Sequence, residues 1–99
     1  DIRYTNKDFQ FFLRVSALIF NKDETKVLLF NVEGRDFYML PGGKIEELEE
    51  SIDAIKREVK EELGWDNLEY SFLGVSEEFV SSKGYNNQQL NLNHYIATH

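Results

Sequence analysis

A long and mostly apolar run, FQFFLRVSALIF, occupies Phe9–Phe20. Within it, the alternate positions on one side of an extended chain are all aliphatic or small: Leu13, Val15, Ala17 and Ile19. A run with so little polar alternation is typical of a strand that is at least partly buried on both faces. We therefore predict a strand here, with its apolar side chains in the core.

Further segments have the pattern of strands separated by polar turns. We expect strands at Lys26–Val32, Phe37–Leu40, Leu68–Val75 with an irregular end at Phe79–Val80, and Gln88–Thr98. The segments between them predict turns at Asn21–Thr25 and Glu33–Asp36 and a loop at Ser81–Asn87. The short turn after the first strand predicts a hairpin with the second.

The segment Pro41–Gly43 interrupts this pattern and predicts a special backbone shape, because it combines the only proline with two glycines. A helix is expected after it, from about Glu50 or Ser51 to Leu63. Ser51 is a candidate N-cap, and Gly64 stands where a left-handed C-cap residue belongs.

At about 100° per residue, the helix has one apolar stripe and two charged flanks. The stripe consists of Ile52, Ile55, Val59 and Leu63. Lys56 and Lys60 share one flank, and Glu58, Glu61 and Glu62 crowd the other. Like charges at this spacing destabilise a helix by about 0.2–0.5 kcal/mol per pair. A solvated acidic face is one explanation; a divalent cation is the other, which we favour because the lysines are not interleaved.

Such a cluster suits chemistry on a phosphate-bearing substrate. Clustered carboxylate oxygens are the ligands that Mg²⁺, Mn²⁺ and Ca²⁺ prefer, and Mg²⁺ commonly also binds substrate phosphates. A metal-activated water and a further carboxylate are the means to hydrolyse a diphosphate. The glycines of Pro41–Gly43 allow backbone groups, including a carbonyl ligand, to approach the cation closely.

Composition narrows the class of protein. The chain has 99 residues, which predicts one domain spanning 1–99. Its net charge of −7 argues against a nucleic acid polymer or an anionic membrane as partner. The absence of cysteine excludes disulfides, zinc thiolate sites and thiol catalysis. No signal peptide or membrane span is visible, so we expect a cytoplasmic protein.

The segment after the glycines resembles the Nudix box. Nine fixed positions over 23 residues match it: Gly43, Glu49, Arg57, Glu58, Val59, Glu61, Glu62, Gly64 and Trp65. The resemblance implies an α/β fold, the Nudix-type α/β/α sandwich with a mixed central sheet. It also implies that the chain is a piece of a longer domain, whose last strands and second major helix would follow His99.

The resemblance further implies a pyrophosphohydrolase that uses Mg²⁺ or Mn²⁺ to cleave a nucleoside diphosphate linked to another moiety. Glu58 and Glu62 would be the main metal ligands, and Glu61 a ligand or the base. Glu49 would be a supporting carboxylate or a further ligand, and Arg57 would pair with it or with another carboxylate of the box. Gly43, or Gly42 beside it, would offer a carbonyl ligand.

Two departures from the family pattern concern single positions. Leu48 stands where many members have glycine, which changes the loop without removing a ligand. Many members also have a later glutamate that serves as ligand or base, and the corresponding position here is Gln88 or Gln89. Glu77 and Glu78 are possible substitutes, although a surface role is the simpler expectation for both.

Candidate substrate contacts lie outside the box. Arg14, in an otherwise apolar strand, is expected either to reach a substrate phosphate or to pair with an acidic neighbour. Phe37 and Tyr38 are placed to stack on a base or to pack in the core. His94 lacks a spaced partner and is expected to be structural or exposed.

Two readings of function follow. The first is hydrolysis of a small-molecule nucleoside diphosphate derivative, either a sugar nucleotide resembling ADP-ribose or a (d)NTP. Both a monomer and a homodimer are compatible with this hypothesis. The alternative is a non-hydrolytic nucleotide-binding module with the same fold, which is disfavoured because every carboxylate of the box is present.

Overall fold

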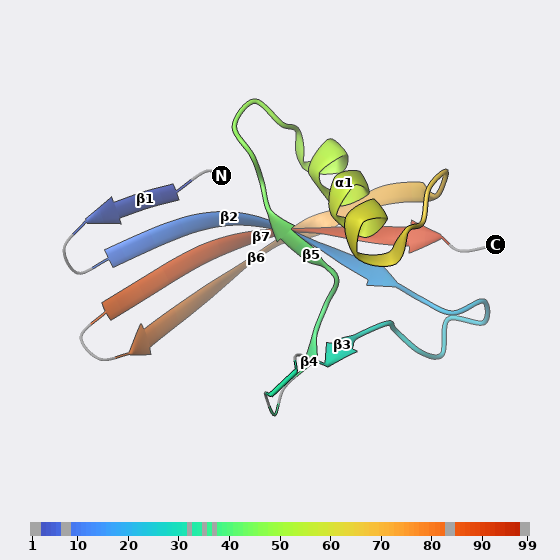
Figure 1. The fold of residues 1–99 in the computed structure, drawn as a ribbon, viewed down its shortest axis with the longest axis horizontal. Helices are drawn as coiled ribbons and strands as arrows, with labels where there is room; N and C mark the ends of the chain where they lie inside the picture. Colours follow the sequence, from blue (N-terminus) through green and yellow to red (C-terminus); the bar gives the residue numbers. More distant parts are fainter. Residues whose placement is uncertain are drawn as a thin grey trace.

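The structure is a computed structural model that describes residues 3–6, 9–31, 33–34, 36, 38–82 and 85–97 (Figure 1). Its elements, in chain order, are β1 (Arg3–Asn6), β2 (Phe9–Ile19), β3 (Phe30–Asn31), β4 (Tyr38–Met39), β5 (Gly42–Lys44), α1 (Ser51–Leu63), β6 (Glu69–Ser82) and β7 (Tyr85–Ala97). Among these residues, no helix is both long and apolar enough to cross a membrane.

The main sheet is mixed, as predicted. Its strands follow the order β1-β2-β7-β6, and β5 pairs with β2 on the same edge as β1. The central pair, β2 and β7, is parallel, whereas the other pairs are antiparallel. Figure 1 shows α1 covering part of this sheet, with the β6–β7 hairpin extending beyond it. The described residues contribute this one helix, so a second helical layer is not among them.

The core forms where α1 packs on β2, β5 and β7. Alternate residues of β2 face the helix and are buried, as the sequence predicted: Val15, Ala17 and Ile19. From the apolar stripe of α1, Ile55 and Val59 are fully buried. The stripe therefore fixes which side of the helix faces the sheet, and its acidic flank lies beside the glycine segment.

Several expected boundaries were wrong. Of the strand expected at Lys26–Val32, the described residues 26–31 contain only β3 and one isolated bridge, from Val27 to Phe20. In place of the expected loop at Ser81–Asn87, β6 continues to Ser82 and β7 begins at Tyr85. Polar residues extend this hairpin because pairing across the strands satisfies their backbone groups, which side-chain patterns do not reveal.

The helix begins at Ser51, one of the two expected positions, but the expected N-cap was wrong. Glu50 is the N-cap and makes no side-chain capping bond, whereas Ser51 is already helical. The Ser51 hydroxyl instead lies 3.4 Å from Nε2 of His94, which is buried in β7. Gly64 does adopt the predicted left-handed C-cap conformation, with φ of 73°.

Candidate active site

The glycine segment forms an unpredicted short strand, β5, against β2. Gly42 passes so close to the carbonyl of Val15 that a Cβ atom there would collide with it. At Gly43, a Cβ atom would collide with the carboxylate of Glu58. The two glycines therefore let the backbone lie directly against β2 on one side and against the acidic flank of α1 on the other.

Arg57 connects the loop before α1 to the acidic flank. Its Nε and Nη2 donate to the two carboxylate oxygens of Glu49, at 2.8 and 2.9 Å. Nη1 donates to Glu58 at 2.8 Å and lies 3.6 Å from Glu61, and Nη2 also donates to the carbonyl of Lys44. The predicted pairing of Arg57 with Glu49 is therefore present, and the same guanidinium orients Glu58.

This arrangement changes the acidity of both partners. The hydrogen bonds from Arg57 lower the pKa of Glu49 to about 2, against an ordinary value of 4.5. The carboxylates of Glu49 and Glu58 raise the pKa of the Arg57 guanidinium. Both charges are therefore held over the whole physiological range of pH.

Glu62 has a different environment. One of its oxygens, Oε1, accepts a hydrogen bond from the backbone N–H of Gly42 at 3.0 Å. Burial raises the pKa of Glu62, and the negative charges of Glu58 and Glu61 raise it further. The three predicted metal-ligating carboxylates are thus close enough for their charges to oppose one another, as the helical spacing implied.

The donor set fits a hard divalent cation, although the side chains are now turned to protein partners. In the described part of the chain, no three acidic or histidine side chains converge closely enough to enclose a metal ion as they stand. Glu58 is engaged with Arg57, and Glu62 with Gly42. Glu61 is 60% exposed. With the backbone of Gly43 beside Glu58, the available ligands are all oxygens, which suits Mg²⁺ or Mn²⁺.

A hollow in two parts lies next to this cluster, and Arg14 lines both parts. The part of about 420 Å³ is lined by Arg14, Gly42 and Glu62 together with Phe30, Asn31, Met39 and Leu40. The part of about 330 Å³ shares Arg14, Met39 and Leu40 and adds Ser16, Tyr38, Glu78, Gln89 and Asn91. We call it the Arg14 hollow; its volume is in the range of small-molecule sites.

The hollow brings together two of the three predicted substrate contacts, Arg14 and Tyr38. Phe37 lies outside the described residues. Of the two glutamates considered as substitutes for a later ligand, Glu78 lines the hollow, whereas Glu77 pairs with Gln88. Asn91 was missed from the sequence. The sequence feature that could have identified Asn91 is the alternation of side chains along β7, which places Gln89 and Asn91 on one face of the strand.

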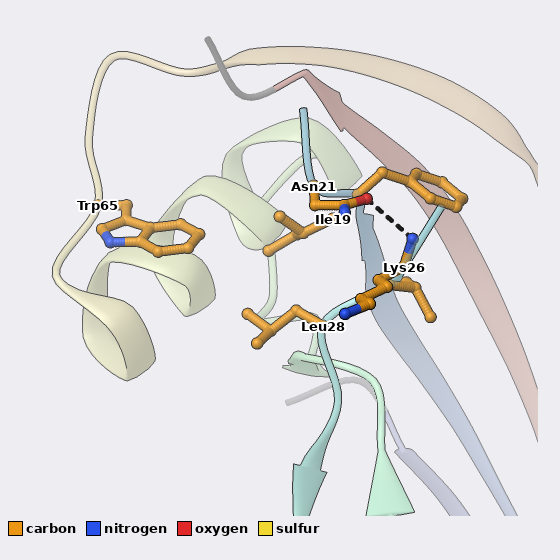
Figure 2. A pocket seen from close by; sticks show the side chains of 7 residues that line it. Ile19, Asn21, Lys26, Leu28 and Trp65 are labelled. Carbon is orange, nitrogen blue, oxygen red and sulfur yellow. Dashed lines mark hydrogen bonds between the residues drawn. The ribbon is translucent and has the colours of Figure 1, made fainter. Parts of the chain in front are cut away.

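A second hollow, of about 350 Å³, is lined mostly by apolar side chains, with Asn21 and Lys26 as its polar members, and has no carboxylate (Figure 2). Ile19 and Leu28 face Trp65 across it, and the backbone N–H of Lys26 donates to the side-chain oxygen of Asn21 at its edge. Because none of these lining residues is acidic, this hollow differs in chemical character from the Arg14 hollow.

Comparison with known proteins assigns the family. The NUDIX domain model matches residues 10–98, which is most of the chain. The chain belongs to the NUDIX domain family. The segment from Gly43 to Trp65, with its glutamates and arginine, is therefore the Nudix box of this domain.

Among the relatives of this Nudix chain are two proteins from different organisms with sequence identities of 40% or more. The m7GpppN-mRNA hydrolase of Saccharomyces cerevisiae is 44% identical over 54 residues, which are 54% of this chain and 6% of that protein. The 8-oxo-dGDP phosphatase of Danio rerio is 40% identical over 67 residues, 65% of this chain and 20% of that protein. The chain thus spans a fifth or less of the length of these relatives.

A solved structure supports the fold. The MutT NUDIX hydrolase from Burkholderia pseudomallei superposes with a TM-score of 0.63 and is 23% identical, over 90% of this chain and 70% of that one. The predicted α/β fold with a mixed central sheet is confirmed.

Proposed function

We propose that this Nudix domain hydrolyses the diphosphate linkage of a nucleoside diphosphate joined to another moiety, using Mg²⁺ or Mn²⁺. The observation that carries the proposal is the position of the Arg14 hollow, whose lining includes Glu62 of the acidic cluster. Membership of the NUDIX domain family supports the same class of reaction.

Each residue of the cluster has a role in this proposal. Glu58 and Glu62 hold the cation, Glu61 is a further ligand or the base that takes a proton from the attacking water, and Gly43 offers its carbonyl. When bound, the cation would neutralise the negative charge that builds up on the diphosphate oxygens. Because only Oε1 of Glu62 accepts from the N–H of Gly42, its second carboxylate oxygen would be available to the cation.

Arg57 and Glu49 act as positioning residues. Because Arg57 bonds both oxygens of Glu49, its guanidinium plane is fixed, and Nη1 then fixes the orientation of Glu58. Arg14 lines the hollow together with Glu62, and its positive charge partly offsets the rise in pKa that burial causes at Glu62. We assign it to a phosphate of the substrate, where a guanidinium binds two oxygens at once.

The substrate is proposed to be a small molecule, a sugar nucleotide or a (d)NTP. The names of the two relatives specify m7GpppN-mRNA and 8-oxo-dGDP, both of which contain a nucleotide. The net charge of −7 disfavours the phosphate-by-phosphate contact that a long polynucleotide requires.

The direct test is hydrolysis of a panel of nucleoside diphosphate derivatives and triphosphates by the 99-residue chain, with product analysis. We expect cleavage at a phosphoanhydride bond that requires Mg²⁺ or Mn²⁺ and stops when the metal is chelated. Tight binding of nucleotides without any cleavage would favour the alternative, a nucleotide-binding module, and would contradict the proposal.

A further inference from the structure

The polar wall of the Arg14 hollow is made by the hairpin of β6 and β7. Glu78 and Gln89 are direct partners across the two strands, and Asn91 pairs with Ser76 two residues further along β7. Because alternate residues of a strand share a face, Glu78, Gln89 and Asn91 point to the same side of the sheet. All three line the hollow together with Tyr38.

A chain of hydrogen bonds fixes the chemical character of this wall. The Gln89 amide nitrogen donates to Oε2 of Glu78 at 3.0 Å and to Oδ1 of Asn91 at 3.5 Å. These contacts orient the Asn91 amide, so its oxygen is used and its nitrogen remains as a donor. The carboxylate of Glu78, which is an acceptor only, keeps lone pairs for a ligand.

The donor of Asn91 is unusual because it is buried and unsatisfied. Asn91 is 4% exposed, and its Nδ2 has no hydrogen-bond partner among the described residues. Buried polar groups are nearly always hydrogen-bonded, and an exception calls for an explanation. A carbonyl oxygen of a ligand in the hollow would supply the missing acceptor.

The wall therefore offers a carboxylate acceptor next to an amide donor. Its complement is a ligand with N–H donors beside a carbonyl oxygen. Guanine has two neighbouring N–H donors, at N1 and N2, followed by the O6 carbonyl. In adenine and cytosine, an unprotonated ring nitrogen would face the Glu78 carboxylate, and two acceptors repel each other. Uracil has one N–H, flanked by carbonyls on both sides.

We propose that Glu78, Gln89 and Asn91 recognise the base of the substrate and that this base is guanine. Glu78 accepts from N1–H and N2–H, Asn91 donates to O6, and Gln89 holds both in place. The ring of Tyr38, which is 64% exposed at the edge of the hollow, stacks on the base. The identification of the ligand as a substrate rests on the proposed function, whereas recognition of the base does not.

The test is calorimetric binding of GMP, IMP and AMP to the 99-residue chain in the presence of Mg²⁺. These monophosphates have no diphosphate to hydrolyse, and IMP differs from GMP only by the missing 2-amino group. We expect GMP to bind at least about tenfold more tightly than IMP or AMP. This is the discrimination that a pair of hydrogen bonds to one base typically provides. Glu78→Gln should abolish the difference between GMP and IMP.

Glu77→Gln is the matched control, because the substitution is identical, one residue away, and Glu77 contacts Gln88 instead of lining the hollow. It should leave the preference for GMP unchanged. Equal affinities for the three nucleotides, undetectable binding of GMP, or a preference that survives Glu78→Gln would overturn the proposal. Hydrolysis without base preference would refute this inference alone, and a GMP preference without hydrolysis of any nucleotide would refute the proposed function alone.

Discussion

Gly43 is the residue on which the geometry of the acidic cluster depends most directly. Its backbone is not in the left-handed region, so alanine would cost little backbone strain. The new Cβ atom would, however, occupy the place of the Glu58 carboxylate. We expect Gly43→Ala to lower activity about 10- to 100-fold, the effect typical of displacing a group that orients metal ligands.

Thermal unfolding and Mn²⁺ affinity should be measured on the Gly43→Ala protein alongside activity. The expected result is a nearly unchanged melting temperature with weaker Mn²⁺ binding. Activity and Mn²⁺ affinity equal to those of the natural chain would show that Glu58 does not need its present position.

The pair formed by Glu49 and Arg57 makes a pH-dependent contribution to stability. The pKa of Glu49 is about 2 in the folded protein and 4.5 ordinarily. A lowered pKa means that the unfolded chain binds more protons between these values, so this contribution is full above about pH 4.5 and is lost as the pH falls towards 2. Glu49→Gln should lower the unfolding free energy at pH 7 by about 1–3 kcal/mol.

Denaturant unfolding at several pH values checks this prediction. The difference in unfolding free energy between the natural chain and Glu49→Gln should shrink as the medium becomes acidic. A difference that stays constant from pH 7 to pH 3 would contradict the assignment of the pair.

At the scale of elements, the C-cap residue Gly64 ends α1 directly after Leu63. It therefore fixes where the acidic flank stops, at Glu62. Gly64 has a φ of 73°, and an added Cβ atom would meet nothing within 4 Å. Gly64→Ala therefore costs only the strain of the left-handed conformation, about 1–2 kcal/mol. Gly64→Asn should cost less, because asparagine tolerates this conformation.

Chemical denaturation of the two Gly64 variants distinguishes a conformational cost from a steric one. We expect asparagine, the larger side chain, to be the less harmful substitution. If asparagine destabilises the chain more than alanine does, crowding must dominate at this site.

The helix and its neighbours also show how far sequence reasoning reaches. The limits of α1, its buried stripe and its acidic flank were predictable, because they depend on local periodicity and on capping by Gly64. The short strand β5 was not, because it exists only through a close approach of Gly42 to β2. The limits of the β6–β7 hairpin likewise depend on pairing between strands, which leaves little trace in either strand alone.

The residues of the candidate site also fall into those that the sequence predicts and those that it does not. The box carboxylates and Arg57 could be predicted because they belong to one helix and the loop before it. The wall of Glu78, Gln89 and Asn91 could not, since two strands must first pair in the observed register to bring these residues beside Arg14. Strand alternation predicts which residues share a face but not what lies opposite that face.

At the scale of the whole molecule, one core joins α1 to the sheet and thereby holds the acidic cluster beside β5. Ile55 is completely buried in this core. Ile55→Ala should lower the unfolding free energy by about 2–5 kcal/mol through lost burial and a cavity. Because Ile55 is buried and does not line the Arg14 hollow, activity per folded molecule should change little below the new melting temperature.

Calorimetry combined with activity measured at increasing temperature tests this separation. Loss of activity in Ile55→Ala should follow its own unfolding curve. Inactivity at temperatures where the variant remains folded would show that core packing also sets the geometry of the cluster.

The most direct test of the central claim, that the acidic flank of α1 carries metal-dependent hydrolysis, is the turnover number of Glu62→Gln. Glu47→Gln is the matched control, an identical change at an exposed position in the turn before α1. We predict a loss of roughly a hundredfold or more in Glu62→Gln, with an unchanged melting temperature, and no loss in Glu47→Gln. Full activity in Glu62→Gln would contradict the account.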